Sequence, residues 1–194
     1  MKTDIIIAGV GGQGILSIAT VIGAAAVNMK LNIKQSEVHG MSQRGGAVYS
    51  HLRLSDKEIA SDLIPLGKAD LTISTEPMEA LRYLPFMSPT GWLVTNTQPF
   101  VNISNYPDIN SVLNSLKVVQ NHVLIDADTL ARASGNIKTS NMIMLGAATP
   151  FLNIDIKELE NAVAIIFAKK GENIVETNIQ ALNAGFQYAT QVCQ

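Results

Sequence analysis

The N-terminal part of the chain combines a continuous apolar run with apolar positions at helical spacing. Residues 4–8 read Asp-Ile-Ile-Ile-Ala, a run typical of a strand buried on both faces of a parallel sheet. A glycine-rich turn follows, and then a helical pattern whose apolar positions are Ile15, Ile18, Ile22, Ala25 and Met29. We therefore predict a helix to about Lys30 and a second strand over 33–38. Strand, helix and strand should form a βαβ unit with a right-handed crossover in a parallel sheet.

Four more strands are predicted from short apolar or alternating runs, at 47–54, 70–74, 91–95 and 122–125. Thr75-Glu76-Pro77 is typical of a helix start. The polar, Asn-rich segment 100–107 predicts a loop.

From Thr139 onward the pattern is helical only, with helices predicted over 141–148, around 156–166 and from Val175. The last helix has a narrow apolar seam, formed by Val175, Ile179, Leu182, Phe186, Ala189 and Cys193. The predicted fold class is therefore α/β: a Rossmann-like three-layer domain with a mostly parallel sheet and a helical C-terminal part. No linker divides the chain, so we expect one domain over residues 1–194.

Charged residues are scarce. The 194 residues include 14 basic and 16 acidic side chains, a formal net charge of -2, and 47% hydrophobic residues. The charged fraction is 15%, against roughly a quarter in an ordinary soluble domain. This composition excludes a disordered chain, a polybasic nucleic-acid binder and a disulfide-stapled secreted module. Permanent interfaces are depleted in charge, so we expect an apolar patch near Glu37–Gly46 or along the Val175–Cys193 seam, free or covered by a second copy in a homodimer.

The stretch from Ile5 to Met29 is uncharged, and apolar runs of about 18 residues can span a membrane. Here the glycines between Gly9 and Gly14 interrupt any helix in its first third, so a strand, a turn and a helix explain the run better. The N-terminus lacks the basic region of a signal sequence. We therefore expect a cytoplasmic protein that contacts neither membrane nor nucleic acid.

The turn Gly9-Val10-Gly11-Gly12-Gln13-Gly14 satisfies G-x-G-x-x-G between a predicted strand and a predicted helix. In that context glycines allow a tight turn and let a phosphate approach bare backbone, while free N–H groups and the helix dipole favour an anion. Glu37 lies 23 positions after Gly14, roughly where a dinucleotide-binding fold keeps its ribose-binding acid. The turn could bind a dinucleotide, bind another phosphate-bearing ligand, or only reverse the chain.

The segment Glu37–Gly46 gathers a carboxylate, an imidazole and a guanidinium at the carboxyl end of a predicted strand, where ligands bind in open α/β sheets. The planar guanidinium group of Arg44, followed by two glycines, is suited to binding a carboxylate or a phosphate. The alternative is a polar surface loop whose glycines serve turn geometry only.

The other polar candidates favour structural roles. His51 and His122 lie in or beside predicted strands, and Asp126 and Asp128 suit a helix start better than a metal site, since no third ligand is near. The sequence has no P-loop lysine, nucleophile elbow or zinc-binding His pair, so we predict no catalytic residue and no metal site in this chain.

Two motifs carry a family resemblance: Ile-Ile-Ile-Ala-Gly-Val-Gly-Gly-Gln-Gly near the start, and Glu-Val-His-Gly-Met-Ser-Gln-Arg-Gly-Gly near residue 40. Together they resemble the gamma-type subunits, or the equivalent domains, of 2-oxoacid:ferredoxin oxidoreductases. The second motif is most similar to the beta subunits of the indolepyruvate:ferredoxin enzymes. The resemblance extends over essentially the whole chain, although the two motifs carry nearly all of its specificity.

The resemblance implies an enzyme subunit that is inactive alone. The complete enzymes of this family oxidatively decarboxylate a 2-oxo acid with coenzyme A and reduce ferredoxin, using thiamine diphosphate, magnesium and iron–sulfur clusters of the 4Fe-4S type. This chain has one cysteine, Cys193, and no Gly-Asp-Gly stretch of the kind that begins a thiamine diphosphate signature. A cluster needs about four ligands, so we expect this chain to bind none of these cofactors alone and a large alpha subunit to carry them.

Residues implied at the contact with that subunit, or along the coenzyme A path, are Glu37, His39, Met41, Gln43 and Arg44. A second implied contact with coenzyme A phosphates is the turn, through Gly9, Gly11, Gly12, Gln13 and Gly14. Two other interpretations remain at the level of sequence: a stand-alone NAD(P)-binding oxidoreductase and a nucleotide-binding regulatory module.

Overall fold

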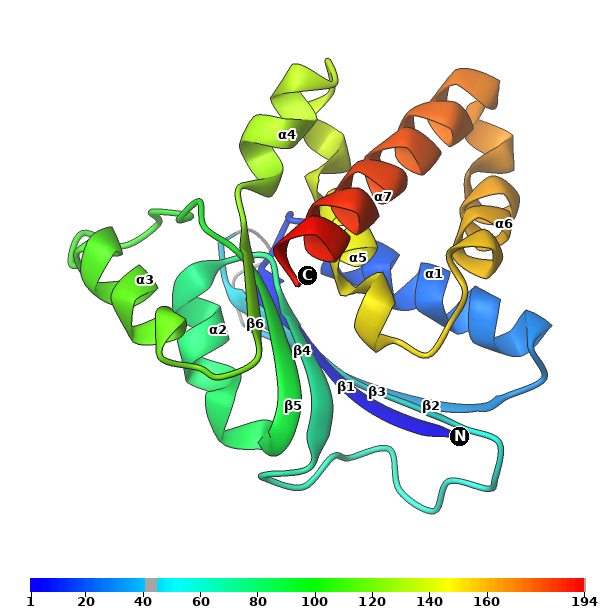
Figure 1. Ribbon diagram of the computed structural model, residues 1–194, viewed down its shortest axis with the longest axis horizontal. Coiled ribbons are helices and arrows are strands. Elements are labelled where there is room, and N and C mark those ends of the chain that lie inside the picture. Colours follow the sequence, from blue (N-terminus) through cyan, green and yellow to red (C-terminus); the bar gives the residue numbers. More distant parts are fainter. Residues whose placement is uncertain (41–44, 194) are drawn as a thin grey trace.

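A computed structural model describes residues 1–40 and 45–193 (Figure 1). Its sheet has the strand order β2-β3-β1-β4-β5-β6. The strands are β1 Lys2–Val10, β2 Asn32–His39, β3 Ala47–Ser55, β4 Ala69–Ser74, β5 Met87–Asn96 and β6 His122–Ile125. The α-helices are α1 Ile15–Asn28, α2 Pro77–Tyr83, α3 Ile109–Lys117, α4 Ala127–Ala133, α5 Ser140–Ala148, α6 Ile156–Phe167 and α7 Glu172–Val192. Short 3₁₀ turns are Leu84–Phe86, Ile137–Thr139, Thr149–Phe151 and Ala168–Lys170.

Helices cover both faces of the sheet, so the predicted three-layer α/β fold is confirmed (Figure 1). Helices α2 and α3 lie on one face, whereas α1 and α5 pack on the other with α6 and α7 outside them. Five of the six strands run in the same direction, which fits a mostly parallel sheet.

Strand β3 is the exception, and it lies between the two strands of the predicted βαβ unit. It runs antiparallel between β1 and β2, pairing Val10 with Ala47 on one side and His39 with Val48 on the other. Strand β2 is therefore parallel to β1 but separated from it by a whole strand, about 10 Å away instead of about 5 Å. The two strands of the predicted βαβ unit are therefore parallel as expected, but they are not neighbours, because the strand after β2 returns at once and takes the place beside β1.

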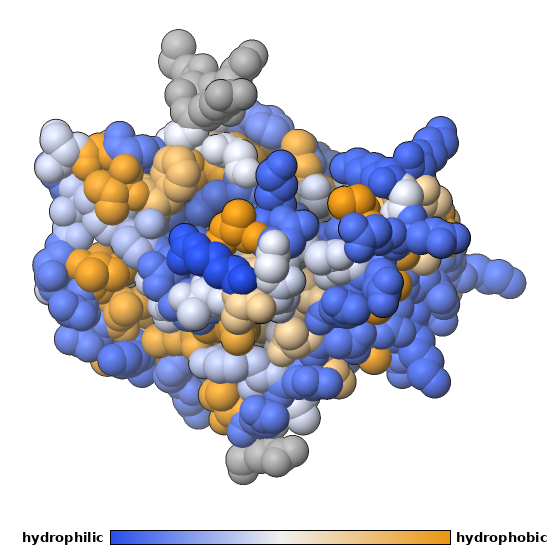
Figure 2. Space-filling view, turned by 90° about the horizontal axis from the view of Figure 1, so that it is seen from above, coloured by the Kyte–Doolittle hydropathy of each residue, from blue (hydrophilic) through white to orange (hydrophobic). Residues whose placement is uncertain are grey.

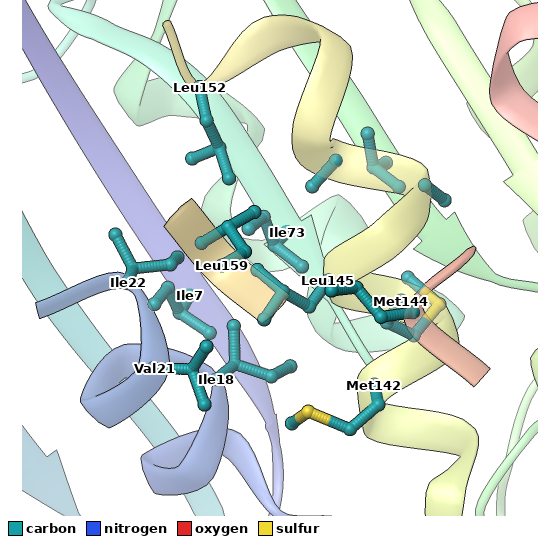
Figure 3. Close-up of a cluster of buried hydrophobic side chains, with 14 of the residues drawn as sticks. Ile7, Ile18, Val21, Ile22, Ile73, Met142, Met144, Leu145, Leu152 and Leu159 are labelled. Atoms are coloured by element: carbon teal, nitrogen blue, oxygen red, sulfur yellow. The ribbon is translucent and has the colours of Figure 1, made fainter. Parts of the chain in front are cut away.

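The main core lies between the sheet and the helices α1, α5 and α6 (Figure 3). Ile7 of β1 and Ile73 of β4 meet Ile22 of α1, Leu145 of α5 and Leu159 of α6, and all five side chains are fully buried. Burying a side chain of this size contributes about 1.5–3 kcal/mol. The uncharged run from residue 5 onward is thus core strand and core helix. Among the described residues, no helix combines the length and hydropathy that crossing a membrane requires.

Helices α5 and α7 touch backbone to backbone. A Cβ atom on Gly146 would collide with the Leu182 carbonyl, and one on Gly185 would collide with the Ile143 carbonyl. This crossing rotates α7 relative to the predicted seam, so the buried positions are Asn178, Ala181, Leu182, Gly185 and Ala189. Of the predicted seam only Leu182 and Ala189 are buried, because two glycines rather than large apolar residues define the contact.

On the opposite face, polar side chains of β3 fasten the irregular segment 56–68. The Arg53 guanidinium donates to both carboxylate oxygens of buried Asp4, at 2.8 and 3.0 Å, and to the carbonyls of Ser61 and Leu63. Nearby, the Nδ1 atom of buried His51 accepts from the Ile64 N–H at 3.0 Å. The predicted structural role of His51 is confirmed.

We expect His51 to make the fold sensitive to mild acid. Burial lowers the pKa of His51 from its ordinary value of 6.5. As the pH falls below 6.5, the unfolded chain binds a proton that the folded chain resists, so stability drops by up to about 1.4 kcal/mol per pH unit until the folded pKa is reached. His51→Asn keeps an acceptor for Ile64 without titrating. Denaturant melts between pH 7.5 and 5 should therefore show a shallower loss of stability in the variant; equal slopes would contradict this.

Candidate functional site

The side chain of Gln13 braces the glycine turn against the end of β4. Its amide oxygen accepts from the Val10 N–H at 2.8 Å and from the Thr75 hydroxyl at 2.9 Å. Its amide group donates to the Thr75 carbonyl at 3.2 Å. These three bonds use most of the hydrogen-bonding capacity of Gln13, so the side chain fixes the conformation of the turn.

Close approaches account for the first and last glycines of the motif. A Cβ atom on Gly9 would collide with the Thr75 hydroxyl, and one on Gly14 would collide with the Asn141 side chain at the start of α5. Gly14 also has a left-handed backbone, with φ of 79°, and its carbonyl accepts from the Asn141 amide at 3.3 Å. The turn is therefore packed between β4 on one side and α5 on the other.

Only some backbone amides of the turn are free to bind an anion. The Gly11 N–H donates to the Gly46 carbonyl at 2.8 Å, and the Gln13 N–H donates to the Val10 carbonyl at 3.1 Å. The amides with no acceptor among the described residues are those of Gly12, Gly14, Ile15 and Leu16. They lie at the N-terminus of α1, which has no acidic side chain in its first turn. Free amides and the helix dipole there favour a negatively charged group.

A cavity of about 390 Å³ brings the two sequence motifs together. One wall is the glycine turn with Ile15 and Leu16, and the other is His39, Gly40 and Val48. Two backbone hydrogen bonds join the motifs directly. The Gly45 N–H donates to the Gly11 carbonyl at 3.3 Å, and the Gly11 N–H donates to the Gly46 carbonyl. His39 of the second motif therefore lies beside the glycine turn, as expected if both motifs contribute to one site.

Glu37 lies on the exposed edge strand β2 and does not line this cavity. Its carboxylate is 3.3 Å from the His39 Nε2 atom and accepts a hydrogen bond from the Gln35 amide. Because β3 separates β2 from β1, Glu37 is not on the strand next to β1, where a dinucleotide-binding fold keeps its ribose-binding acid. Met41, Gln43 and Arg44 lie outside the described residues.

A second cavity, of about 640 Å³, shares Gly12 and Gly14 with the first. Its other walls are the connection from α4 to α5 and the region around the start of α7. Lys138 and Lys170 lie at this cavity, as does Asp128. Sequence reasoning missed both lysines and Asn141, because they are more than 100 residues from the turn and no local motif marks them.

The remaining sequence candidates have structural roles. Asp126 caps α4 by accepting from the Thr129 N–H at 2.9 Å, which confirms the predicted helix start. His122 is 2.7 Å from the Val119 carbonyl through Nδ1. Within residues 1–40 and 45–193, no three His, Cys, Asp or Glu side chains are grouped closely enough to hold a metal ion.

Large apolar side chains are exposed near the two motifs. Leu16 and Val38 are 41% and 45% exposed, and Phe100, Val101 and Ile103 are exposed on the loop after β5. The expected patch along α7 takes another form, in which Val175 and Ile179 line a groove of about 510 Å³ against α6.

Comparison with known proteins identifies the class. A model of the pyruvate ferredoxin/flavodoxin oxidoreductase family matches residues 4–188. The chain is 34% identical over 198 residues to the indolepyruvate oxidoreductase subunit IorB of Methanothermobacter thermautotrophicus, with 98% of this chain and 100% of that protein covered. It superimposes on pyruvate oxidoreductase subunit PORC of Thermotoga maritima with a TM-score of 0.75 and 18% identity, over 96% of both chains.

The same fold also occurs inside a longer polypeptide. The chain superimposes on 2-oxoglutarate:ferredoxin oxidoreductase of Magnetococcus marinus with a TM-score of 0.78 and 21% identity, covering 98% of this chain but 31% of that one. The chain belongs to the pyruvate ferredoxin/flavodoxin oxidoreductase family. Within it, the chain is a subunit of the 2-oxoacid:ferredoxin oxidoreductase type, which confirms the resemblance seen in the two motifs.

Substitutions in the turn should separate backbone strain from side-chain collision. Gly14→Ala adds a Cβ atom both in a left-handed conformation and against Asn141, so we expect a loss of about 2–4 kcal/mol in stability. Gly12→Ala is the matched control, since Gly12 also has positive φ but faces open space, and it should cost about 1–2 kcal/mol. In a double-mutant cycle, Asn141→Ala should recover part of the Gly14→Ala loss; strict additivity would contradict the packing described above.

Proposed function

We propose that this chain is the small subunit of an enzyme that oxidatively decarboxylates indolepyruvate or a related aryl 2-oxo acid to an acyl-coenzyme A, with reduction of ferredoxin. The observation that carries the proposal is the match to an indolepyruvate oxidoreductase subunit at 34% identity over 98% of this chain and 100% of the relative. Nearly all of this chain therefore aligns with the whole of a protein that is itself named as one subunit.

The side chains that this chain offers as cofactor ligands suit a subunit that binds neither an iron–sulfur cluster nor thiamine diphosphate. Cys193 is the one cysteine of the sequence, and its side chain is exposed at the end of α7. Clusters are bound by about four cysteine thiolates each. We therefore assign thiamine diphosphate, magnesium and the iron–sulfur clusters to a large alpha subunit, which also supplies the contact with ferredoxin.

The site of this chain fits the phosphate groups of coenzyme A. When bound, coenzyme A supplies the thiol that accepts the acyl group. The free amides of the α1 N-terminus, with Lys138 and Lys170 at the second cavity, offer donors and positive charge for phosphates. The first cavity is smaller and is lined mainly by glycine backbone and by Ile15, Leu16 and Val48, which suits an uncharged arm. In this proposal the chain binds and orients the acyl acceptor and contributes no proton transfer.

The segment Glu37–Gly46 would then lie between the coenzyme A path and the large subunit. Its described end is fixed to the glycine turn by the two bonds between Gly11 and residues 45 and 46. Glu37, His39, Met41, Gln43 and Arg44 are the proposed contacts on this segment.

Substrate preference tests the proposed function directly. The chain should be co-expressed and purified with its large subunit, and ferredoxin reduction measured with indolepyruvate, phenylpyruvate, pyruvate and 2-oxoglutarate. We expect the aryl substrates to have a kcat/KM at least about tenfold higher, since this corresponds to roughly 1.4 kcal/mol of discrimination. The isolated chain should be colourless and inactive with NAD(P). A preference for 2-oxoglutarate, or activity of the isolated chain, would refute the proposal.

The coenzyme A contact predicts a selective change in KM. In the complex, Lys138→Ala combined with Lys170→Ala should raise the KM for coenzyme A about tenfold, roughly 1.4 kcal/mol, and leave the KM for the 2-oxo acid unchanged. Lys117→Ala is the control, because Lys117 is an exposed lysine on α3 across the sheet. Arg44→Ala should raise the same KM or weaken assembly of the complex. Unchanged kinetics and assembly in all of these variants would exclude the contact.

A further inference from the structure

The loop between β5 and α3 exposes several large apolar side chains close together in the sequence. We call residues 97–107 the strap. It contains no charged side chain, yet it exposes three large apolar ones, Phe100, Val101 and Ile103, at 40%, 67% and 41%. Figure 2 looks onto the end of the molecule that lies at the top of Figure 1, and it shows apolar groups between hydrophilic ones on the side of α3. Exposed large apolar side chains that are grouped, as these three are within residues 100–103, can mark a site of interaction with another protein.

A buried carboxylate fixes the strap at two points. Glu76, only 1% exposed, caps α2 by accepting from the Glu79 N–H at 2.8 Å. Its other oxygen accepts from the Phe100 N–H at 3.4 Å and from the Tyr106 hydroxyl. Burial, reinforced by the bond to Glu76, raises the pKa of Tyr106, so its hydroxyl remains a donor at neutral pH.

The strap is also joined to the glycine turn. The Asn102 amide donates to the Gly45 carbonyl, and Gly45 in turn donates to the Gly11 carbonyl at 3.3 Å. Phe100 lies beside Gly45 and also lines the second cavity. The exposed apolar residues are therefore held next to the segment that we propose as a contact with the large subunit.

We propose that the strap is the apolar centre of the surface through which this chain docks onto its large subunit, and that Glu76 and Tyr106 position it. This inference rests on the proposed function and extends it to residues outside both motifs.

The chemistry of the strap fits a protein partner. The centres of protein interfaces are depleted in charge and enriched in aromatic and large apolar residues. Without Lys or Arg, the strap has no group to neutralise the phosphates of a nucleic acid or of an anionic lipid surface. In the Magnetococcus marinus enzyme, a domain of this fold makes up only 31% of its chain, so one polypeptide there combines the fold with a larger body.

Binding of the purified large subunit tests the docking surface. Val101→Asp should weaken its Kd at least about tenfold, because a charge would be buried at the centre of the interface. Val118→Asp is the matched control: Val118 is 83% exposed at the end of α3, and its substitution should leave the Kd unchanged. Equal binding by both variants would overturn the docking surface while the proposed function stands.

Two Tyr→Phe variants test whether Tyr106 positions the strap. Tyr106→Phe removes the hydroxyl that holds the strap, and Tyr188→Phe removes one that donates to the Leu124 carbonyl at 2.8 Å. Both should lower the melting temperature, but only Tyr106→Phe should weaken binding of the large subunit, by about threefold to tenfold. Parallel effects of the two variants on binding would refute a positioning role.

Two other outcomes are decisive. If the wild-type chain binds no large subunit, the proposed function fails as well. If Val101→Asp changes only self-association in sedimentation, the strap is an interface between copies of this chain and the proposal is overturned.

Discussion

The antiparallel insertion of β3 between β1 and β2 is the constraint on which the site depends. It returns the chain from the edge of the sheet to the centre, so that Gly45 and Gly46 arrive beside Gly11 and exchange backbone hydrogen bonds with it. If β2 were instead the direct neighbour of β1, no antiparallel strand would carry the end of the second motif back to the glycine turn. The insertion therefore makes one site of two motifs that are about 30 residues apart, and it moves Glu37 away from the place of a ribose-binding acid.

Local patterns were sufficient to predict most elements and the fold class. Buried strands such as 70–74, the helix after the glycine turn and the cap at Asp126 follow from hydropathy, spacing and side-chain chemistry within a few residues. The pairing of β3 could not be predicted, because its alternating sequence fits a place between two strands as well as a place at an edge. The rotation of α7 was missed for a related reason: Gly146 and Gly185 carry no apolar signal, although they set the closest helix contact.

The residues of the candidate site also fall into two groups, those that local sequence patterns predict and those that they do not. Its glycine turn and His39 were predicted from sequence, since the chemistry of each is local. Lys138 and Asn141 were not, because their importance arises from contacts with residues far away in the chain. The same holds outside the site for Glu76, which was predicted at a helix start but not as the partner of Tyr106. Gln13 lies inside a sequence pattern typical of ligand binding, but its side-chain hydrogen bonds hold the turn. The motif alone does not distinguish these two roles.

The contact between Gly14 and Asn141 has a consequence for the order in which the protein matures. The turn is synthesised before its wall, α5, and α5 is held by the backbone contact with α7, which is synthesised later still. Both helices must have left the ribosome before this helix pair can form. The glycine turn is thus translated well before the helices that complete its surroundings, and it reaches its final packing only after they have formed.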